Sequence, residues 1–388
     1  MSIVSPARRA VIAGIGQTEF SRASGRSEQR LAAEAALAAC ADAALDPAKI
    51  DGLITFAIDK SDEIDLQRAL GIEECRYTIR LPQGGAASVT TLVHAARAVE
   101  SGFCDHVIIW RAMNERSQYR FGQPHFGISL DAHSSTFMEW CFPFGAQTPA
   151  AWECLSAGPY LSRYGVTSED LGRVSVLLRQ NAATNPASWF HGKPITLEDH
   201  QASKWIVAPW LRLLDCCQES DGGVAILVTT AERARDLRQI PVKLLGAEYA
   251  MLFNHEIITD FYQGDLACLP VSERVRDRLT ASTGLAPRET DVAMIYDNFT
   301  PQVLRQLEAF GFCGPGEAKD YIREGHCALD GQTPLSPNGG LIGEAYIHGV
   351  NNITEAVRQV RGTAANQVRD ARTAFVGAGV AGAILARD

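Results

Sequence analysis

The sequence predicts an α/β fold built from two similar halves. Short apolar strands alternate with helical patterns along most of the chain, an order typical of α/β folds. Each half also has a glycine-glycine turn, then an amphipathic helix that ends at a glycine, Gly102 or Gly362, and then a short buried strand. This repetition indicates an internal duplication of a βαβ-based layer. The halves are expected at residues 1–240 and 241–388.

Local signals place the elements of the first half. Ser27 caps an alanine-rich helix that stops near Pro47, and Gly84 and Gly85 form a turn that leads into a second helix. Gly102 ends that second helix, because glycine adopts the conformation of a helix C-cap without steric cost. The strands are predicted at residues 9–20, 52–58, 106–110 and 224–230, and the helices at 27–45 and 89–100.

Residues 116–209 depart from this pattern and are dense in glycine, proline and aromatic residues. Two helices are predicted within them, at 149–164 and 168–181, and Thr167 and Asp170 give the second helix a capping box. We interpret the region as an inserted lid or loop whose aromatic side chains form a small core, with an apolar substrate wall as the alternative. These residues are Tyr119, Phe121, Phe126, Phe137, Trp140, Phe142 and Phe144.

The second half repeats the alternation of strands and helices. Its last helix carries Ile353, Val357 and Val360 on one apolar face. A G-x-G-x-x-G match at residues 377–382 follows a strand, but only six residues remain for the helix and strand that a dinucleotide site requires, so we reject it. The other elements are predicted as strands at 242–253, 292–296, 373–377 and 379–386 and helices at 271–283 and 301–310.

The composition is that of a soluble globular protein with a sizeable core. The 388 residues are 46% hydrophobic and 21% charged, with a formal net charge of −9. The negative charge argues against a general nucleic-acid surface. No apolar run approaches the roughly 18 residues that a membrane span needs, and the run near residue 10 is too short for a secretory signal. We therefore expect a cytoplasmic protein with no membrane span and no nucleic-acid partner.

The ten cysteines contain no C-x-x-C pair, which argues against a zinc ribbon in this chain, and we expect no metal site. In a chain of this length they are interpreted as small buried hydrophobic residues in a reducing compartment. They lie at positions 40, 75, 104, 141, 154, 216, 217, 268, 313 and 327.

A glycine-rich loop that leads into a helix is the first candidate site. Glycine lets a substrate approach the backbone, and the start of the following helix holds the side chains in place. The alternative is an ordinary loop before a surface helix. The loop is Asn338-Gly339-Gly340, and the ionisable cluster after it is Glu344, Tyr346 and His348.

A second candidate cluster is Tyr296, Asp297 and Asn298, at the end of a buried strand and just before a helix. In open α/β sheets, sites assemble at the carboxyl ends of strands. Tyr296 and Tyr346 could therefore converge on one site. The alternative is that Tyr296 is a core tyrosine whose hydroxyl is satisfied internally.

The order of these motifs resembles the thiolase superfamily, in its sterol-carrier-protein and lipid-transfer-protein branch. The resemblance covers nearly the whole chain. It implies the thiolase fold, in which two similar βαβαβαββ halves form a five-layered α-β-α-β-α body with a loop domain inserted in the first half. The motifs are Gly-Gly-Ala-Ala-Ser before the helix that ends at Gly102, then Asp221-Gly-Gly, Tyr296-Asp-Asn-Phe, Asn338-Gly-Gly-Leu and Glu-Ala-Tyr346.

The departures from the family pattern are as informative as the matches. Thiolases carry a nucleophilic cysteine just before the first helix, where this chain has Gly85. Their Gly-His-Pro motif becomes Ala-Tyr346-Ile here, and His-Asp-Cys-Phe becomes Tyr296-Asp-Asn-Phe. The nucleophile and both histidines are therefore missing. Without a thiolate the chain cannot form the usual acyl-enzyme.

The combination resembles the thiolase-like steroid aldolases of bacterial sterol and bile-acid side-chain degradation. That resemblance implies retro-aldol cleavage of a β-hydroxyacyl-CoA steroid by two tyrosines, which releases a short acyl-CoA and a steroid ketone or aldehyde. It also implies an accessory protein with an OB fold and a zinc ribbon, a homodimer core and an α₂β₂ complex. No cofactor is expected in this chain, and any zinc would belong to the partner.

Tyr296 and Tyr346 are thus the candidate acid and base. A phenol has a reference pKa of about 10, so one tyrosine needs a donor or a cation nearby if it is to act as a base near neutral pH. The candidates for tuning or for an oxyanion hole are His348, Asn298 and Asn338, with Asp297 and Glu344 in support. The glycines expected to line the substrate are Gly84, Gly85, Gly339 and Gly340.

Two other functions stay open from the sequence. The chain could be a catalytically silent scaffold that binds lipid or acyl-CoA. Tyrosines at both histidine positions favour a catalytic role. In a protein that had lost its activity, we would expect these positions to hold unrelated residues such as alanine, leucine or serine. The chain could also be an acyltransferase with another nucleophile, such as Cys75 or Cys104, although neither lies at a turn before a helix.

Overall fold

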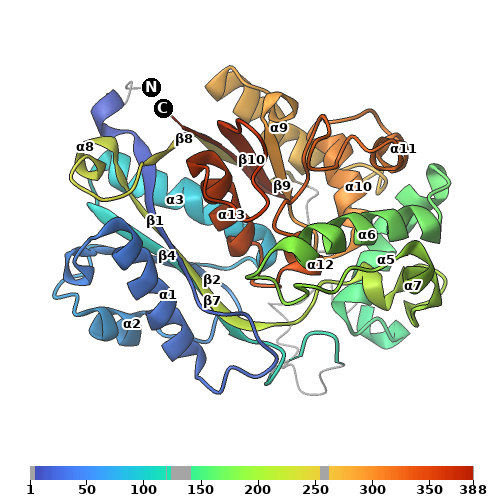
Figure 1. Cartoon of the computed structure of the whole chain (residues 1–388), viewed down its shortest axis with the longest axis horizontal. Helices are drawn as coiled ribbons and strands as arrows, with labels where there is room; N and C mark the ends of the chain where they lie inside the picture. Colours follow the sequence, from blue (N-terminus) through green and yellow to red (C-terminus); the bar gives the residue numbers. More distant parts are fainter. Residues whose placement is uncertain (1–4, 119, 124–140, 254–261, 388) are drawn as a thin grey trace.

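A nine-stranded mixed sheet forms the body of the molecule (Figure 1). The computed structural model describes residues 5–118, 120–123, 141–253 and 262–387. The strands are β1 (Ala10–Gln17), β2 (Gly52–Phe56), β3 (Tyr77–Leu81), β4 (His106–Asn114), β7 (Asp221–Thr230), β8 (Val242–Tyr249), β9 (Val292–Ile295), β10 (Thr373–Ala378) and β11 (Ala381–Ala386).

The sheet repeats one strand order in its two halves. The first half runs β3-β2-β4-β7-β1, and the second half runs β9-β10-β11-β8. Corresponding neighbours have the same polarity. The pairs β2–β4 and β9–β10 are parallel, and the pairs β4–β7, β7–β1, β10–β11 and β11–β8 are antiparallel. The edge strand β3 pairs in parallel with β2. A single parallel bridge between Ala293 and Leu335 stands where β3 stands in the first half. The predicted duplication is confirmed, with one edge strand reduced to a bridge.

Helices complete the five predicted layers. The helix α1 (Glu28–Ala43) packs on β1, β4 and β7, on the outer face of the first half. The helices α3 (Ser88–Ser101) and α13 (Val350–Arg361) lie between the halves and contact strands of both. The helix α9 (Pro270–Thr283) covers β8 and β11 on the far side (Figure 1). The two halves meet where β1 pairs with β8 in antiparallel fashion.

Strong local signals are confirmed. The Ser27 hydroxyl accepts a hydrogen bond from the Arg30 amide at the start of α1, and Gly102 and Gly362 end α3 and α13 in the left-handed conformation. The strand predicted at 106–110 is longer, because β4 continues to Asn114 and buries a charged residue on the way. Residues 377–382 form the hairpin between β10 and β11 rather than a dinucleotide loop.

Short elements with weak periodicity are the ones that sequence reasoning missed. Among them, α2 buries two leucines, and β3 is an edge strand with alternating exposure. The missed elements include α2 (Glu63–Leu70), β3, α7 (Leu197–Ala202), β5 (Trp205–Val207), β6 (Leu211–Arg212), α8 (Ala231–Ala234) and α11 (Ala318–Arg323). The 3₁₀ helices are Pro6–Arg8, Pro47–Lys49, Gly85–Ala87, Phe142–Phe144, Leu213–Asp215 and Pro287–Glu289.

The inserted region packs on the second half. Its helices α5 (Pro149–Arg163) and α6 (Ser168–Thr184) contact α10 (Thr300–Ala309), and α6 also contacts the short helix α12 (Gly340–Gly343). The expectation that the insert aromatics form one core is wrong for the described residues: Phe142 stacks on Trp152 and Phe121 on His348, but Phe144 is 83% exposed. The aromatics Tyr119, Phe126, Phe137 and Trp140 lie outside the described residues.

Candidate active site

Two phenols from opposite parts of the second half meet in the core. Tyr296 directly follows β9, and Tyr346 lies in the loop between α12 and α13. Their hydroxyl oxygens are 2.9 Å apart, and each residue is less than one-tenth exposed. Both belong to the same apolar cluster, between the end of β9 and the central helices. The structure therefore brings together the two tyrosines that the sequence singled out.

Gly85 makes room for this pair. A Cβ atom on Gly85 would lie 1.8 Å from the Tyr296 hydroxyl, which is less than any non-bonded contact permits. A Cβ on Gly349 would also lie 2.9 Å from the Tyr296 ring. The Tyr296 phenol thus fills the space in front of the turn that begins α3. If the chain is aligned with thiolases as the resemblance implies, this space is where a cysteine side chain at position 85 would lie.

The second glycine loop serves a different purpose from the one expected. The Asp297 carboxylate accepts hydrogen bonds from the Leu341 amide at 2.8 Å and the Ile342 amide at 3.1 Å. A Cβ on Gly340 would lie 2.2 Å from that carboxylate, and a Cβ on Gly339 would lie 2.5 Å from the Ala182 Cβ atom. These two glycines, which we had expected to line the substrate, instead allow close packing. The Asp297 carboxylate holds the loop in place through its hydrogen bonds to the Leu341 and Ile342 amides.

Glu344 lies in a cage of asparagine amides. Its carboxylate accepts hydrogen bonds from the side chains of Asn185 at 3.0 Å, Asn338 at 2.7 Å and Asn351 at 2.9 Å. Burial raises the pKa of Glu344, and the amides oppose the shift. The Asn338 side-chain oxygen also accepts from the Gly340 amide. Asn338 is therefore held against the loop by both ends of its amide, with one amide hydrogen given to Glu344.

His348 is tied to an arginine that the sequence analysis overlooked. A nitrogen of the Arg111 guanidinium donates to His348 Nδ1, and the His348 ring meets the Tyr346 ring edge to face at 4.7 Å between centroids. Since arginine can only donate, His348 must carry its proton on Nε2. Burial and the nearby guanidinium hold the pKa of His348 well below its usual value, so the imidazole is neutral.

Arg111 is fully buried on β4. Its guanidinium donates to the carbonyl oxygens of Phe56 at 2.9 Å and Ala57 at 2.8 Å, and it lies 3.9 Å from the Asp59 carboxylate. Burial raises the pKa of Tyr296, and the Arg111 charge opposes that shift. A buried cation is thus close to the phenols. The sequence does give one indication of Arg111, because it directly follows the apolar residues 107–110 of a predicted strand.

The described cysteines offer no alternative nucleophile. Burial raises the pKa of Cys104 to about 12 and also raises the pKa of Cys75. Cys217 lies close to the tyrosines, where burial again raises the pKa of the thiol well above its usual value. Thiolates, not thiols, attack acyl groups. Among the described residues, no group of three or more histidine, cysteine or acidic side chains could hold a metal ion.

Asn298 keeps an unsatisfied amide beside the pair. Its side-chain oxygen is buried and has no hydrogen-bond partner among the described residues, while its backbone carbonyl accepts from the Cys217 amide at 2.9 Å. Buried polar atoms without partners are rare in folded proteins. Of the supporting residues expected from the sequence, Asp297, Asn338 and Glu344 form hydrogen bonds within the loop, and the roles of all five in the reaction stay predictions.

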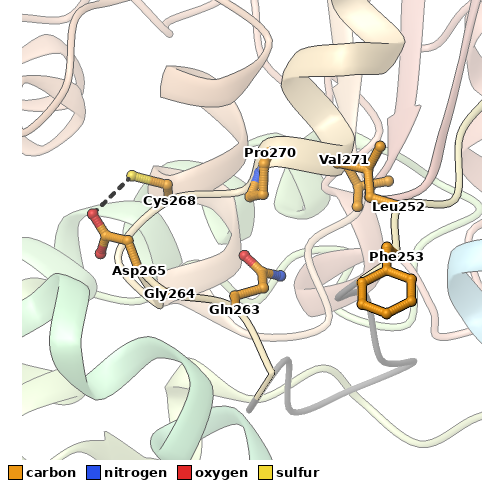
Figure 2. A pocket seen from close by; sticks show the side chains of 8 residues that line it. All are labelled: Leu252, Phe253, Gln263, Gly264, Asp265, Cys268, Pro270 and Val271. Atoms are coloured by element: carbon orange, nitrogen blue, oxygen red, sulfur yellow. Dashed lines mark hydrogen bonds between the residues drawn. The ribbon is translucent and has the colours of Figure 1, made fainter.

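A separate cavity of about 420 Å³ lies at the start of α9 (Figure 2). Neither tyrosine lines it. It adjoins the end of β8, where the Tyr249 hydroxyl accepts a hydrogen bond from Gln83, the residue before the Gly84–Gly85 turn. A Cβ atom on Gly84 would meet an Ile58 carbon at 3.9 Å, which is an ordinary van der Waals contact. The cavity is lined by Leu252, Phe253, Gln263, Gly264, Asp265, Cys268, Pro270 and Val271.

Among the proteins that match this chain over nearly its whole length are two lyases that are almost half identical to it. Residues 262–387 match the family described as "Thiolase C-terminal domain-like". The chain is 49% identical over 384 residues to a "Steroid side-chain-cleaving aldolase" of Thermomonospora curvata, with 98% of both chains covered. It is 48% identical over 372 residues to a "17-hydroxy-3-oxo-4-pregnene-20-carboxyl-CoA lyase" of Mycobacterium tuberculosis, with 96% of both covered.

Solved structures of similar proteins have the same fold as this chain. The structure titled "Ltp2-ChsH2(DUF35) aldolase" superposes with a TM-score of 0.93 at 48% identity and covers 100% of this chain and 99% of that one. A monomeric SCP2-thiolase-like protein from Mycobacterium smegmatis superposes with a TM-score of 0.72 at 20% identity, covering 100% of this chain and 78% of that one. The second likeness concerns the fold alone. Within the described residues, no helix is long and apolar enough to cross a membrane.

Proposed function

The chain belongs to the thiolase superfamily, in its branch of steroid side-chain-cleaving aldolases, and from this premise we propose that Tyr296 and Tyr346 are its acid–base pair. The protein is a carbon–carbon lyase that performs retro-aldol cleavage on a steroid side chain. The observation that supports the assignment is the 2.9 Å contact between two buried phenols, in the space left by a nucleophile that the chain lacks.

The reaction needs one proton removed and one proton delivered. A base takes the proton of the β-hydroxyl group, the bond between the α and β carbons breaks, and the β carbon becomes a ketone or an aldehyde. The electron pair moves onto the thioester as an enolate. An acid then protonates the α carbon, which gives the short acyl-CoA. No acyl-enzyme forms, so the absence of a cysteine at position 85 is consistent with the reaction.

A hydrogen-bonded pair of phenols suits this exchange. Burial raises the pKa of both tyrosines, which disfavours a free phenolate on either one. Two hydroxyls in contact can pass a proton along as one accepts from the substrate and the other donates to the α carbon. Neither phenol then carries a full charge in the resting enzyme. General acid–base groups of this kind contribute roughly 10²–10⁴-fold to the rate.

Arg111 and His348 support the pair from one side. The guanidinium fixes the imidazole tautomer, and the imidazole ring holds the Tyr346 ring edge to face. Because Arg111 also lies close to Tyr296, its charge favours any negative charge that develops on that phenol. This arrangement supplies the cation that a tyrosine base requires. The NH₂ group of the Asn298 side chain is a further proposed donor to the enolate oxygen, whereas its unpartnered Oδ1 can only accept.

The substrate and the partner follow from the relatives. A similar lyase is named for a CoA thioester of a steroid carboxylate, and a similar structure is titled as an aldolase with a ChsH2(DUF35) protein. The chain thus acts on a steroid CoA thioester with a partner protein. We further propose that this partner has an OB fold and a zinc ribbon, docks near the 116–209 insert and forms a heterotetramer around a homodimer of this chain. Any zinc then belongs to the partner.

The test is product analysis with a panel of β-hydroxyacyl-CoA steroids. The chain is purified alone and after co-expression with such a partner, and each preparation is examined by size-exclusion chromatography and mass spectrometry. We expect an acyl-CoA and a steroid ketone or aldehyde, with the co-expressed complex more active than the chain alone. Binding without cleavage would favour the silent acyl-CoA scaffold. Full turnover by a monomer, unchanged by the partner, would overturn the proposed assembly.

A further inference from the structure

Glu115 is a buried acidic residue close to the tyrosine pair. It directly follows β4, where side chains alternate between two cores. Trp110 and Ala112 point into the core under α1, whereas Val107 and Ile109 point into the central core that contains both tyrosines. Arg111 has the parity of the second set. Glu115 lies in the turn after β4, next to Asn114, which pairs with Asp221, and close to the segment before β7 in which Glu219 is bridged to Tyr346. A negative charge on Glu115 would raise the pKa of both tyrosines, so the carboxyl lies close enough to interact with them.

The Glu115 carboxyl is buried, and one of its two oxygens has no partner in the described part of the chain. It is 2% exposed, and its Oε2 atom has no hydrogen-bond partner among the described residues. Burial and the adjacent Glu219 carboxylate raise the pKa of Glu115 well above its usual value. The titratable and charged groups around it are Arg111 on β4, Arg120 after β4, Cys217 and Glu219 before β7, Asp221 on β7, Tyr296 and Tyr346.

Resting on the proposed function, we propose that Glu115 is a catalytic residue that acts as a neutral carboxylic acid and donates a hydrogen bond to the enolate oxygen of the cleaved thioester. An ionised carboxylate accepts only, whereas a protonated one has a single O–H donor. A carboxylic acid kept neutral by an apolar site is an effective oxyanion donor. The proton stays on Glu115 throughout, so the tyrosine pair still carries the net transfer from the β-hydroxyl oxygen to the α carbon.

The experiment uses three variants of the co-expressed enzyme. Glu115→Gln keeps a donor of nearly the same shape but cannot ionise, and Glu115→Leu removes the donor. Glu355→Gln is the matched control, because Glu355 is equally buried and has a pKa raised to about 7 by burial, but it already accepts a hydrogen bond from Gln359 at 2.9 Å. We measure kcat and KM against pH, together with the infrared band of protonated carboxyl groups.

The three variants distinguish a hydrogen-bond donor at position 115 from a base and from a structural residue. Wild-type kcat should fall as the pH rises through the pKa of Glu115, since the donor ionises. Glu115→Gln should lose that fall and keep kcat within about tenfold at low pH, while Glu115→Leu should lose about 10²-fold in kcat with little change in KM. The infrared band should shrink in Glu115→Gln relative to the wild type. Glu355→Gln should retain the wild-type pH profile.

Two outcomes would overturn the role of Glu115. Loss of activity in Glu115→Gln at every pH would make the residue a base, since an amide can donate but cannot accept the proton. An unchanged pH profile in both Glu115 variants would leave it no catalytic role. Either result can occur in an enzyme that still cleaves its substrate. The proposed function itself fails only when the wild-type complex gives no cleavage.

Discussion

Two clusters of buried polar groups surround Glu344 and Tyr346, which are two residues apart, and the clusters are satisfied in opposite ways. The Glu344 carboxylate has three amide donors from Asn185, Asn338 and Asn351. The tyrosine pair has its mutual hydrogen bond, but Asn298 and Glu115 beside it each leave an oxygen without a partner among the described residues. A completed network rigidifies the fold, whereas an incomplete one next to a reactive pair keeps donors and acceptors free for a substrate.

The largest expected effect is at the pair itself. Tyr296→Phe and Tyr346→Phe each remove only a hydroxyl, so both variants should fold while cleavage falls by about 10²–10⁴-fold. The measurement is kcat with a β-hydroxyacyl-CoA steroid, with the melting temperature as the control for folding. A variant that keeps more than about one-tenth of wild-type turnover would not have lost an acid or a base.

Gly85→Ala should have the next largest effect. Its Cβ atom would displace the Tyr296 hydroxyl, which lies 1.8 Å from that position, and a displacement of about 1 Å can cost roughly 10²-fold in rate. Gly84→Ala is the matched control, because the nearest atom to its Cβ would be an Ile58 carbon at 3.9 Å. Equal turnover in the two variants would show that the position of the Tyr296 phenol does not limit the reaction.

The amide cage should affect stability more than turnover. Asn185→Ala removes one donor from the buried Glu344 carboxylate, and we expect the free energy of unfolding to fall by about 1–3 kcal/mol. Asn298→Ala deletes an amide whose oxygen has no partner, so it should lower kcat rather than the melting temperature. The comparison of the two clusters would be wrong if Asn298→Ala destabilised the protein and Asn185→Ala did not.

The smallest effect is expected from thiol chemistry. Retro-aldol cleavage needs no acyl-enzyme, and burial raises the pKa of Cys75, Cys104 and Cys217. Alkylation of the thiols should therefore yield no adduct that substrate protects, and mass analysis of enzyme quenched during turnover should find no acyl-cysteine. Detection of such an intermediate would restore the thiolase-type reaction.

The sequence predicted the duplicated fold and the central pair of tyrosines because both rest on local signals. Caps at Ser27 and Gly102 define helices without knowledge of their partners. Tyr296 and Tyr346 belong to the motifs on which the resemblance to thiolases rests, at the two positions where that resemblance implies histidines. Short elements such as α2 were missed, since their stability comes from packing rather than from periodicity.

The roles of the supporting residues depended on contacts between distant segments. Asn338 and Asp297 have the same residue types as catalytic donors and acceptors, and only the fold reveals that their partners are Glu344 and the start of α12. Arg111 and Glu115 lay just beyond a strand predicted to end at residue 110. A charged residue next to an apolar run gives no indication of which side chain it will meet across the sheet.

The contact between position 85 and Tyr296 also restricts how this enzyme could have arisen. Any residue larger than glycine at position 85 would place an atom 1.8 Å from the phenol oxygen, so a cysteine nucleophile and this tyrosine cannot occupy the site together in the present geometry. In a lineage descended from a thiolase with cysteine there, the cysteine had to be lost before the tyrosine settled in this position, or at the same step. In such a lineage the two chemistries could not have worked side by side in this geometry, and reinstating the cysteine alone would restore neither reaction.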